Sequence, residues 1–465
     1  MSSPSSPSPA FSILDLDPGI LENLQSLGYD SMTPIQAQSL PWILSGRDVI
    51  AQGKTGSGKT AAFALGILSK LKAKRFCVQA IVLCPTRELA DQVAEEIRRL
   101  ARSMANTKVL TLTGGSPVGP QIGSLEKGVH IVVGTPGRVE DHIRRETLNL
   151  DNVETLVLDE ADRMLQMGFE ESLDAILAQM PVVRQTLLLS ATYPEKIQNI
   201  AQRVMKEPEM VVVESTHDNA TIEQHFYKLS DDEQRLNALR LLLLQHQPES
   251  ALVFCATRQD VRKISGKLQG HGFSVLPLHG ELDQRERDQT LIRFSNGSAT
   301  VLVATDVAAR GLDIDSLDVV VNYHLGRDSE DHVHRIGRTG RAGGSGMVWS
   351  FYDGRDKPKI KQLQEALGRT IISESLPPPT TLNQRVPRAR MVTLLIDGGK
   401  KQKIRPGDIL GALTGENGVE AAHVGKIKVV SNRSFVAVNR EAVKPALAKL
   451  SAGKLKGRSC RVRTL

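Results

Sequence analysis

The segment Gly53-Lys54-Thr55-Gly56-Ser57-Gly58-Lys59-Thr60 constrains the fold of this chain more than any other feature. It matches the pattern G-x-x-x-x-G-K-[ST], in which the glycines let successive backbone N–H groups face a chain of phosphates. A strand-like run, 47–51, precedes it and a helix-forming run, 61–65, follows it. This order predicts a P-loop at the end of a parallel strand. Lys59 would then reach the β- and γ-phosphates of a nucleotide, and the Thr60 hydroxyl would hold Mg²⁺.

A second segment, Leu156-Val157-Leu158-Asp159-Glu160-Ala161-Asp162, is an apolar run that ends in two adjacent carboxylates. A buried strand would fix the backbone, so that Asp159 emerges beside a metal ion and Glu160 lies next to it to polarise a water. Alone, Asp-Glu after a strand is only moderately specific, because it also occurs at helix N-termini. Together with the P-loop it predicts a nucleoside triphosphatase.

Short apolar runs alternate with helical patterns along most of the chain, as in parallel α/β sheets. Up to residue 213 the strand-like runs are 80–83, 108–112, 130–133, 156–158 and 186–189. The alternation restarts with runs 251–254, 275–278, 300–303, 319–322 and 346–350. The domains that we expect are a disordered tail 1–10, a first lobe 11–213, a linker 214–222, a second lobe 223–370, a second linker 371–385 and a C-terminal domain 386–465.

The C-terminal domain is strongly basic. From residue 382 to the end the chain holds 18 Lys and Arg against 5 Asp and Glu, whereas the whole chain holds 59 and 52. Its pattern predicts a strand 391–396, a helix 408–413, strands 426–430 and 434–438, a helix 441–450 and a strand 459–463. This β-α-β-β-α-β order is that of ferredoxin-like and RNA-recognition domains. A basic domain on a near-neutral body indicates a polyanionic partner.

We expect a cytoplasmic protein without a membrane anchor. The four cysteines form no C-x-x-C pair and are typical of reduced thiols. The Ser/Pro-rich start lacks the basic and apolar regions of a signal peptide. The longest leucine run, 241–244, is too short to cross a bilayer.

The segment from His334 to Gly343, His-Arg-Ile-Gly-Arg-Thr-Gly-Arg-Ala-Gly, places several arginines on the second lobe. In a protein with a P-loop on its other lobe, this pattern favours an arginine finger supplied across a cleft. Such an arginine contributes about 10³–10⁵ in rate to nucleotide hydrolysis. Arg338 and Arg341 are the candidates.

Many separate motifs, in order, resemble those of the DEAD-box RNA helicases of superfamily two, over roughly residues 11–365. They are Gly28-Tyr29-x4-Pro34-Ile35-Gln36, Pro85-Thr86-Arg87-Glu88-Leu89-Ala90, Gly114-Gly115, Thr135-Pro136-Gly137-Arg138, Asp159-Glu160-Ala161-Asp162, Ser190-Ala191-Thr192, Val253 to Thr257, Gln284-x-x-Arg287, Ala304-Thr305-Asp306 and Arg310-Gly311-Leu312-Asp313. The resemblance implies two RecA-like parallel-sheet lobes, ATP and Mg²⁺ as cofactors, and an RNA-stimulated ATPase that separates short RNA duplexes locally.

The same resemblance implies roles for individual residues. The residues implied at ATP are Phe11, Gln36, Gly56, Gly58, Lys59, Thr60 and Asp313. Thr60 and Asp159 would hold the metal, and Glu160, Lys59, Arg338 and Arg341 would act in hydrolysis. Asp162, Ser190 and Thr192 would couple hydrolysis to strand separation. The residues implied at the RNA backbone are Pro85, Thr86, Arg87, Gly115, Thr135, Arg138, Gln284, Arg287 and Thr305.

The C-terminal domain resembles the RNA-binding module of the DbpA-type bacterial helicases, notably in 405–415 and in Gly425-Lys426-Ile427. That resemblance implies binding to 23S ribosomal RNA near hairpin 92 and a role in large-subunit assembly. Phe435 is the only aromatic residue after Leu382, so we expect it in the core and expect RNA binding to use basic side chains. The candidates just after the first strand are Lys400, Lys401, Lys403 and Arg405.

Two other functions share most of these motifs. One is an ATP-gated RNA clamp or chaperone that binds without productive unwinding. The other is a DNA-directed superfamily-two enzyme, against which the RNA-type motifs argue. The sequence gives no indication of the oligomeric state.

Overall fold

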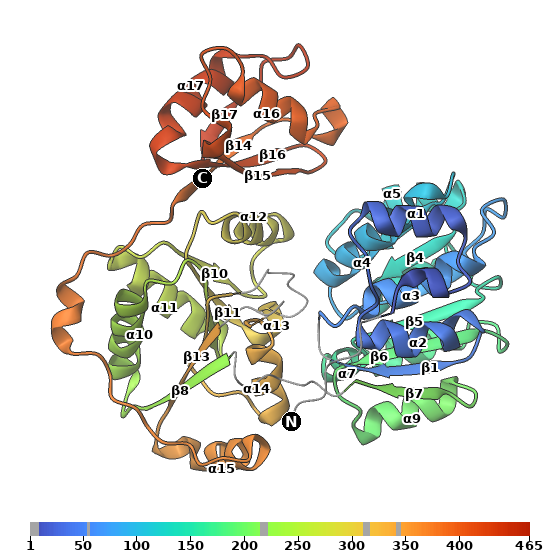
Figure 1. The fold of residues 1–465 in the computed structure, drawn as a ribbon, viewed down its shortest axis with the longest axis horizontal. Helices are drawn as coiled ribbons and strands as arrows, with labels where there is room; N and C mark the ends of the chain where they lie inside the picture. The colour runs from blue at the N-terminus through green and yellow to red at the C-terminus, as the bar shows by residue number, and fades with distance from the viewer. Residues whose placement is uncertain (1–8, 54–55, 214–221, 310–316, 341–345) are drawn as a thin grey trace. The chain divides into compact units, whose positions relative to one another are not determined.

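A computed structural model describes residues 9–53, 56–213, 222–309, 317–340 and 346–465. These residues form two parallel sheets and one small antiparallel sheet (Figure 1). The chain divides into two compact units, and the second unit contains both the second parallel sheet and the antiparallel sheet. The predicted fold class, two parallel-sheet lobes followed by a β-α-β-β-α-β domain, is confirmed.

Lobe 1 is built on seven parallel strands in the order β3-β4-β2-β5-β6-β1-β7. The strands are β1 (Val49–Gln52), β2 (Ala80–Leu83), β3 (Val109–Leu112), β4 (Ile131–Gly134), β5 (Thr155–Asp159), β6 (Gln185–Ser190) and β7 (Glu209–Val212). The central strands β2, β4, β5 and β6 are buried along their whole length. Continuous apolar runs of this kind are typical of parallel strands that helices cover on both faces.

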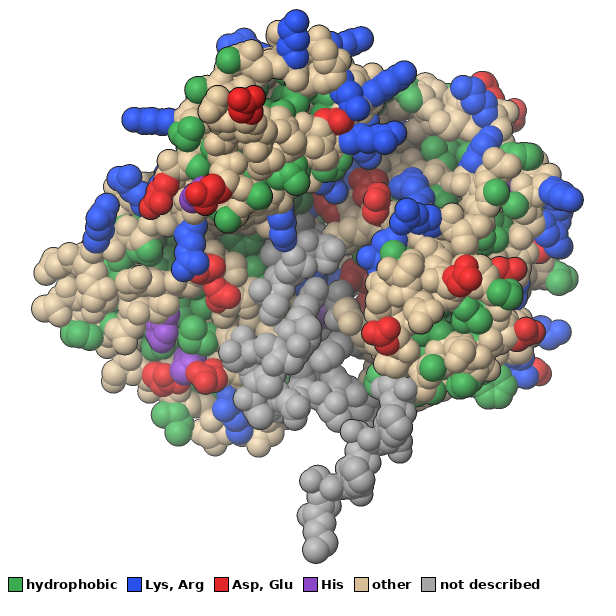
Figure 2. Space-filling model, turned by 45° about the horizontal axis from the view of Figure 1, so that its top comes forward, with side chains coloured by type: hydrophobic (Ala, Val, Ile, Leu, Met, Phe, Trp, Pro, Cys, Tyr) green, Lys and Arg blue, Asp and Glu red, His purple; other side chains and the backbone are tan. Residues whose placement is uncertain are grey.

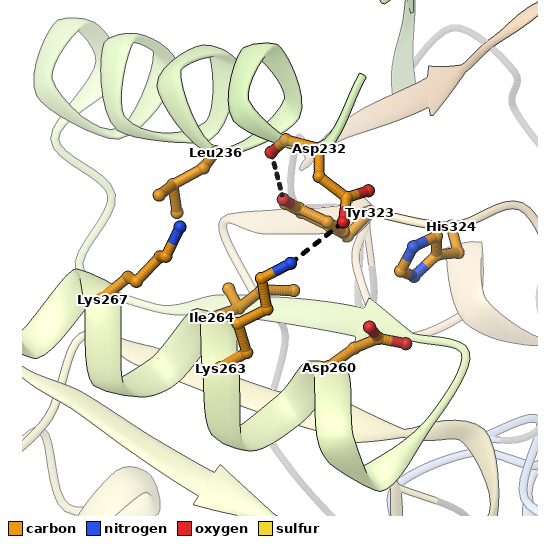
Figure 3. Close-up of a pocket in the computed structure, with 8 residues that line it drawn as sticks. All are labelled: Asp232, Leu236, Asp260, Lys263, Ile264, Lys267, Tyr323 and His324. Carbon is orange, nitrogen blue, oxygen red and sulfur yellow. Dashed lines mark hydrogen bonds and ion pairs between the residues drawn. The ribbon is translucent and has the colours of Figure 1, made fainter. Parts of the chain in front are cut away.

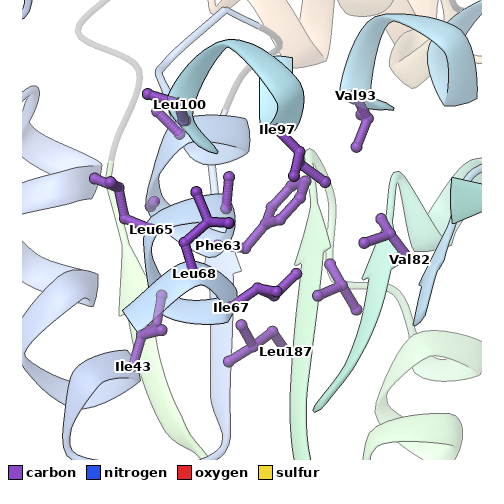
Figure 4. Close-up of a cluster of buried hydrophobic side chains, with 14 of the residues drawn as sticks. Ile43, Phe63, Leu65, Ile67, Leu68, Val82, Val93, Ile97, Leu100 and Leu187 are labelled. Atoms are coloured by element: carbon purple, nitrogen blue, oxygen red, sulfur yellow. The ribbon is translucent and has the colours of Figure 1, made fainter. Parts of the chain in front are cut away.

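Helices cover both faces of this sheet, and alternate strand residues enter different cores (Figure 1). Val82, Leu187 and the helix residue Phe63 lie in one core (Figure 4), whereas Ile81 and Leu188 lie in the other. The helices are α1 (Pro18–Ser26), α2 (Pro34–Leu44), α3 (Lys59–Lys70), α4 (Arg87–Leu100), α5 (Val118–Glu126), α6 (Pro136–Arg144), α7 (Ala161–Gln166), α8 (Glu170–Leu177) and α9 (Glu195–Val204). This two-sided burial fixes the strand ends, where the motifs lie.

Lobe 2 is built on six parallel strands in the order β10-β11-β9-β12-β13-β8. The strands are β8 (Ile222–Lys228), β9 (Ala251–Cys255), β10 (Val275–Leu278), β11 (Val301–Thr305), β12 (Val319–Asn322) and β13 (Gly346–Tyr352). The helices are α10 (Asp232–His246), α11 (Arg258–Gly270), α12 (Gln284–Ser295), α13 (Asp306–Ala309), α14 (Ser329–Ile336) and α15 (Lys357–Leu367). Thr257 and Asp260 form a capping box that begins α11.

The C-terminal domain is an antiparallel sheet in the order β15-β16-β14-β17, with two helices on one face. Its elements are β14 (Met391–Ile396), α16 (Pro406–Thr414), β15 (Val424–Val429), β16 (Ser434–Asn439), α17 (Val443–Ala452) and β17 (Val462–Thr464). Leu394 and Val436 pack against the helices. Thr393 and Phe435, which lie on the opposite face, are buried as well.

The opposite face of this sheet packs against lobe 2 at the turn 296–298. Asn296 Nδ2 donates a hydrogen bond to Thr393 Oγ1 at 2.9 Å, and the hydroxyl oxygens of Ser298 and Thr393 lie 2.8 Å apart. A Cβ atom on Gly297 would lie 3.5 Å from Met391 Cγ. The sheet face on which RNA-recognition domains commonly bind bases is therefore used here, at least in part, for a contact within the chain.

Two strands, β7 and β8, have no counterpart among the predicted runs. β7 is a short edge strand with two exposed residues, and β8 begins at Ile222, the last residue of the expected linker. Neither strand has the uninterrupted apolar run that marks the central strands. The rest of that linker, 214–221, and the tail 1–8 lie outside the described residues.

Candidate active site and nucleic-acid interface

The P-loop lies between β1 and α3, as its sequence predicts. Gly56 and Gly58 have positive φ angles of 84° and 95°, which residues with side chains rarely adopt. A Cβ atom on Gly58 would also lie 2.6 Å from Gln36 Nε2. The ammonium group of Lys59 donates a hydrogen bond to the carbonyl of Gly53, so it lies inside the loop. Lys54 and Thr55 lie outside the described residues.

Two buried hydroxyl groups at this loop, Ser57 Oγ and Ser190 Oγ, have no hydrogen-bond partner in the described part of the chain. Ser190 ends β6, and its carbonyl accepts a hydrogen bond from the N–H of Gly53 at 3.1 Å. Buried polar groups are normally paired, so two unpaired hydroxyls beside this loop leave donors available to a ligand with acceptor oxygens. The residues present thus fit a nucleotide.

Gln36 connects α2 to the P-loop. Its Oε1 accepts a hydrogen bond from Thr33 N at 2.8 Å, and its Nε2 donates to the carbonyl of Gly58 at 3.1 Å. Thr33 Oγ1 donates to the carbonyl of Ser57 at 2.8 Å. Phe11 lies in a short 3₁₀ turn and is buried. Its ring is edge-on to that of Tyr29, with 6.1 Å between the two ring centroids. Contact of Gln36 and Phe11 with adenine stays a prediction.

The carboxylate pair follows β5, again as predicted. Asp159 is the last residue of β5 and is 4% exposed. Burial, and second the neighbouring charge of Glu160, raise the pKa of Asp159 to about 7. Glu160 adopts a left-handed conformation with φ 50°, which turns the chain into α7. The charge of Lys59 lowers this pKa but offsets only part of the effect of burial, and a divalent cation would supply further positive charge.

No group of three or more His, Cys, Asp or Glu side chains among the residues described here could hold a metal by itself. Mg²⁺ commonly takes one or two protein ligands and completes its shell with phosphates and water. Asp159 and Thr60, in the first turn of α3, are the residues that would hold it.

Asp162 and Thr192, which were expected to couple hydrolysis to strand separation, contact each other. Asp162 Oδ2 accepts hydrogen bonds from Thr192 Oγ1 at 3.1 Å and from Thr192 N at 3.3 Å. Asp162 is in the first turn of the helix that follows Glu160, and Thr192 follows β6. The contact therefore joins the ends of two adjacent strands.

Three predicted RNA-contacting segments of lobe 1 follow three neighbouring strands, β2, β3 and β4. Thr86 lies before α4 and accepts a hydrogen bond from Leu89 N at 3.3 Å, while Thr135 lies before α6. Pro85 lies just after β2. The Arg87 guanidinium lies so close to Gly115 that a Cβ atom on Gly115 would be 2.0 Å from Arg87 Nη1. The carboxyl ends of adjacent parallel strands thus gather these segments at one sheet edge.

Arg138 is oriented by a buried network that the sequence did not reveal. Arg138 Nη1 donates to Gln121 Oε1 at 2.8 Å and to the carbonyl of Ser116 at 3.1 Å. His142 Nε2 lies 2.9 Å from the same Gln121 oxygen, and Gln121 Nε2 donates to the carbonyl of Thr113 at 3.2 Å. A lone glutamine in a helix carries no sequence signal for such a role.

In lobe 2, Thr305 ends β11 and Asp306 begins α13. Arg287 Nη2 donates to the carbonyl of Ala308 at 2.7 Å, while Gln284 Nε2 donates to Asp288 within α12 at 2.8 Å. Arg338, 9% exposed, follows α14. Asp313 and Arg341, both predicted site residues, lie outside the described residues.

A small hollow between α10 and α11 is lined by charged and aromatic side chains (Figure 3). Lys263 forms an ion pair with Asp232 at 3.1 Å, and the Tyr323 hydroxyl donates to the carbonyl of Asp232 at 3.3 Å. Its volume of about 10 Å³ has room for no more than a single water. The hollow is therefore not a nucleotide site.

Comparisons with known proteins agree with this geometry. Family models match residues 33–200 (DEAD/DEAH box helicase), 234–343 (helicase conserved C-terminal domain) and 393–464 (DbpA RNA binding domain). The ATP-dependent RNA helicase DbpA of Escherichia coli is 52% identical over 457 residues, which cover 98% of this chain and 99% of that protein. The DEAD-box ATP-dependent RNA helicase CshA of Bacillus cereus is 44% identical over 361 residues, or 78% of this chain and 69% of that protein.

Among solved structures, S. cerevisiae Dbp5 bound to RNA and ADP BeF3 is similar with a TM-score of 0.71 and 30% identity, over 79% of this chain and 96% of that chain. No helix in the described ranges is long and apolar enough to span a membrane.

Proposed function

The chain belongs to the DEAD-box family of ATP-dependent RNA helicases, with a DbpA-type RNA-binding domain, and on this premise we propose that its substrate is structured ribosomal RNA. It is an RNA-dependent ATPase that uses ATP. The proposed target is 23S rRNA near hairpin 92 in precursors of the large subunit. The proposed location is the cytoplasm, whose reducing conditions suit the buried free thiols of Cys84 and Cys255.

The observation that carries this proposal is a basic edge on the C-terminal domain, formed by the loops 397–405, 430–433 and 453–461. Asp397 N donates to the carbonyl of Arg461 at 2.9 Å, and Lys401 N donates to the carbonyl of Ser431 at 2.9 Å, so the loops lie together. The residues of the basic edge are Lys400, Lys401, Lys403, Arg405, Arg433, Lys454, Lys456, Arg458 and Arg461. Most of them are exposed.

Figure 2 shows Lys and Arg side chains in excess over Asp and Glu on the visible face of the C-terminal domain, at the top of the view. Lys456 forms an ion pair with Asp408 at 3.0 Å, which fixes one loop to the start of α16. Among the described residues, most of the other cations of the basic edge form no ion pair as short as that one. Exposed cations on ordered loops suit phosphate contacts.

The proposed chemistry follows from the residues of lobe 1 and the arginines of lobe 2. Lys59 and the P-loop N–H groups would bind the phosphates, and Glu160 would accept a proton from the attacking water. Mg²⁺ held by Thr60 and Asp159 would neutralise charge on the phosphate oxygens. Arg338 and Arg341 would stabilise the charge that develops on the transferred phosphoryl group.

The test is RNA activation of ATP hydrolysis, measured for the full chain with a hairpin-92 fragment and with an unrelated structured RNA of equal length. We expect a lower half-activating concentration for the hairpin-92 fragment. The triple variant Lys400→Ala, Lys401→Ala, Lys403→Ala should remove most of this preference. It should also reduce the slope of log affinity against log salt by about 2 to 3, since each phosphate contact contributes about 0.7–0.9.

The matched control removes three cations elsewhere on the second unit: Lys357→Ala, Lys361→Ala, Arg369→Ala. It should leave the preference unchanged. Equal activation of the wild-type chain by both RNAs would refute the ribosomal target without affecting the assignment as an RNA-dependent ATPase. Displacement of a short duplex that carries the hairpin separates unwinding from the clamp alternative, which predicts ATP-dependent binding without displacement.

A further inference from the structure

We propose that Arg335 is a positioning residue that connects the RNA-facing end of the lobe 2 sheet to the arginine finger. The inference rests on the proposed function, because Arg338 acts as a finger only in that scheme. Arg335 lies inside the arginine-rich segment but, at 3% exposure, is too buried to reach a substrate. Its role must therefore be carried out through the groups that it holds.

Arg335 uses four of its N–H donors on three acceptor groups. Nε and Nη2 donate to the two carboxylate oxygens of Asp306 at 2.6 and 2.7 Å, a bidentate pair. Nη1 donates to Asn322 Oδ1 at 2.9 Å and to the carbonyl of His324 at 2.7 Å. The guanidinium also lies 4.8 Å from the centre of the Phe254 ring. Bidentate, stacked geometry of this kind is specific to arginine.

These contacts join the carboxyl ends of three adjacent strands. Phe254 lies on β9, Asn322 ends β12, and Asp306 follows β11 directly after Thr305. Asp306 is also the first residue of the short helix α13, whose last turn accepts a hydrogen bond from Arg287. The short helix is thus held at both ends, by Arg335 at its start and by Arg287 at the carbonyl of Ala308.

The connection to the finger is one helical turn long. Arg338 N donates to the carbonyl of Arg335 at 3.1 Å, and Leu317 N donates to the carbonyl of Arg338 at 3.2 Å. Thr305, the predicted RNA contact, ends β11 directly before Asp306. A movement of α13 on RNA binding would therefore be passed to Arg335 through the bidentate ion pair. From there it reaches the backbone that carries Arg338.

A purely structural role would give different behaviour. Arg235 provides the comparison, since it is also 3% exposed and also binds a carboxylate, Asp353, at 3.0 Å. It donates to the carbonyls of Tyr323 and Phe351, and none of its hydrogen bonds or ion pairs among the described residues reaches α13 or α14. Loss of either arginine removes a buried ion pair, which is strongly destabilising in general. Only loss of Arg335 should uncouple RNA binding from hydrolysis.

The experiment measures kcat with and without saturating RNA, the half-activating RNA concentration and the KM for ATP, in full-length protein. For Arg335→Lys we expect the ratio of RNA-stimulated to basal kcat to fall at least tenfold, with the KM for ATP within about twofold of wild type. Asp306→Asn should likewise lower the stimulation ratio and leave the KM for ATP nearly unchanged. The double variant should have a stimulation ratio no lower than that of either single variant, because both substitutions remove the same interaction. Arg235→Lys should lower the thermal midpoint comparably but keep the stimulation ratio within about twofold.

The inference is overturned if Arg335→Lys keeps the wild-type stimulation ratio, or if Arg235→Lys loses it to the same extent. Additive losses in the Arg335→Lys, Asp306→Asn double variant would also overturn it. A wild-type chain without RNA stimulation would instead refute the proposed function, so the two failures are distinguishable. If Arg335→Lys does not fold, the stimulation ratio of Asp306→Asn is compared with that of Arg235→Lys instead.

Discussion

At the scale of single residues, the sequence predicted where the P-loop and the carboxylate pair lie in the fold, but not the partners that orient the neighbouring side chains. The P-loop glycines, Lys59 and the carboxylate pair lie in short motifs whose residue order reflects local backbone geometry. Gln121 and Arg335, in contrast, act through residues 8 to 29 positions away along the chain. Such contacts depend on which strands become neighbours in the sheet, so no local sequence pattern predicts them.

Buried His332 illustrates a residue that the motifs did not mark. It lies in the network beneath Arg335, with Nε2 3.2 Å from Gln224 Oε1 and Nδ1 3.4 Å from Asn322 Nδ2. Burial, and second the charge of Arg335, lower the pKa of His332 to about 4. The folded state therefore keeps this imidazole neutral at pH values where the unfolded chain protonates it.

The lowered pKa of His332 predicts a pH dependence of stability. Because the unfolded imidazole takes up a proton below its ordinary pKa of 6.5 and the folded one does not, the free energy of unfolding should fall as pH drops from about 6.5 to about 4. A pKa difference of one between the two states corresponds to about 1.4 kcal/mol. Urea unfolding at about pH 7 and pH 5 should show a smaller loss for His332→Gln than for wild type. Equal losses would contradict the prediction.

At the scale of secondary-structure elements, most strands were predicted within one or two residues. β2, β10, β12 and β14 match their predicted ranges, because largely buried apolar runs bounded by polar or turn residues give sharp boundaries. Helix starts were less exact: α3 begins at Lys59, two residues before the predicted apolar run. The edge strands β7 and β8 were missed because exposure at a sheet edge interrupts the apolar pattern.

The end of β3 provides a test at this scale. Gly115 has φ 74°, and its missing side chain leaves room for the Arg87 guanidinium. Gly115→Ala should displace Arg87 and add roughly 1–2 kcal/mol of backbone strain. If Arg87 contacts an RNA phosphate, the lost charged hydrogen bond should weaken RNA binding about tenfold or more. The measurement is RNA affinity with a non-hydrolysable ATP analogue.

Gly123→Ala is the matched control, since a Cβ atom there meets nothing within 4 Å and the residue lies inside α5. That variant should keep wild-type RNA affinity and gain up to about 1 kcal/mol of stability. Wild-type affinity in Gly115→Ala would remove Arg87 from the proposed RNA interface.

At the scale of the whole molecule, the order of the three sheets followed from the alternation of patterns, but the contact between the C-terminal domain and lobe 2 did not. It depends on a threonine at 0% exposure, Thr393, and on the turn 296–298. Neither segment is unusual in composition. Packing between two folded surfaces is fixed by shape and hydrogen-bond geometry, which one-dimensional periodicity does not encode.

The contact predicts a measurable stabilisation. Thr393→Val keeps the side-chain volume but removes the hydroxyl that pairs with Asn296 and Ser298, so a buried amide loses a partner. The free energy of unfolding of the second unit should fall by about 1–3 kcal/mol, and amide exchange at 296–298 should quicken. Thr464→Val, an exposed threonine on the same sheet, should change neither quantity. Unchanged exchange in Thr393→Val would show that the contact does not hold the domain in solution.

The contact between Thr393 and the turn 296–298 also affects whether the C-terminal domain can be transferred to another enzyme. A domain joined only by a flexible linker can be fused to another enzyme and keeps its own binding affinity. Residues 386–465 instead share hydrogen bonds with their host, so a graft onto another helicase would carry an incomplete surface unless the turn were grafted as well. In this chain, the C-terminal domain and the second lobe share one hydrogen-bonded contact.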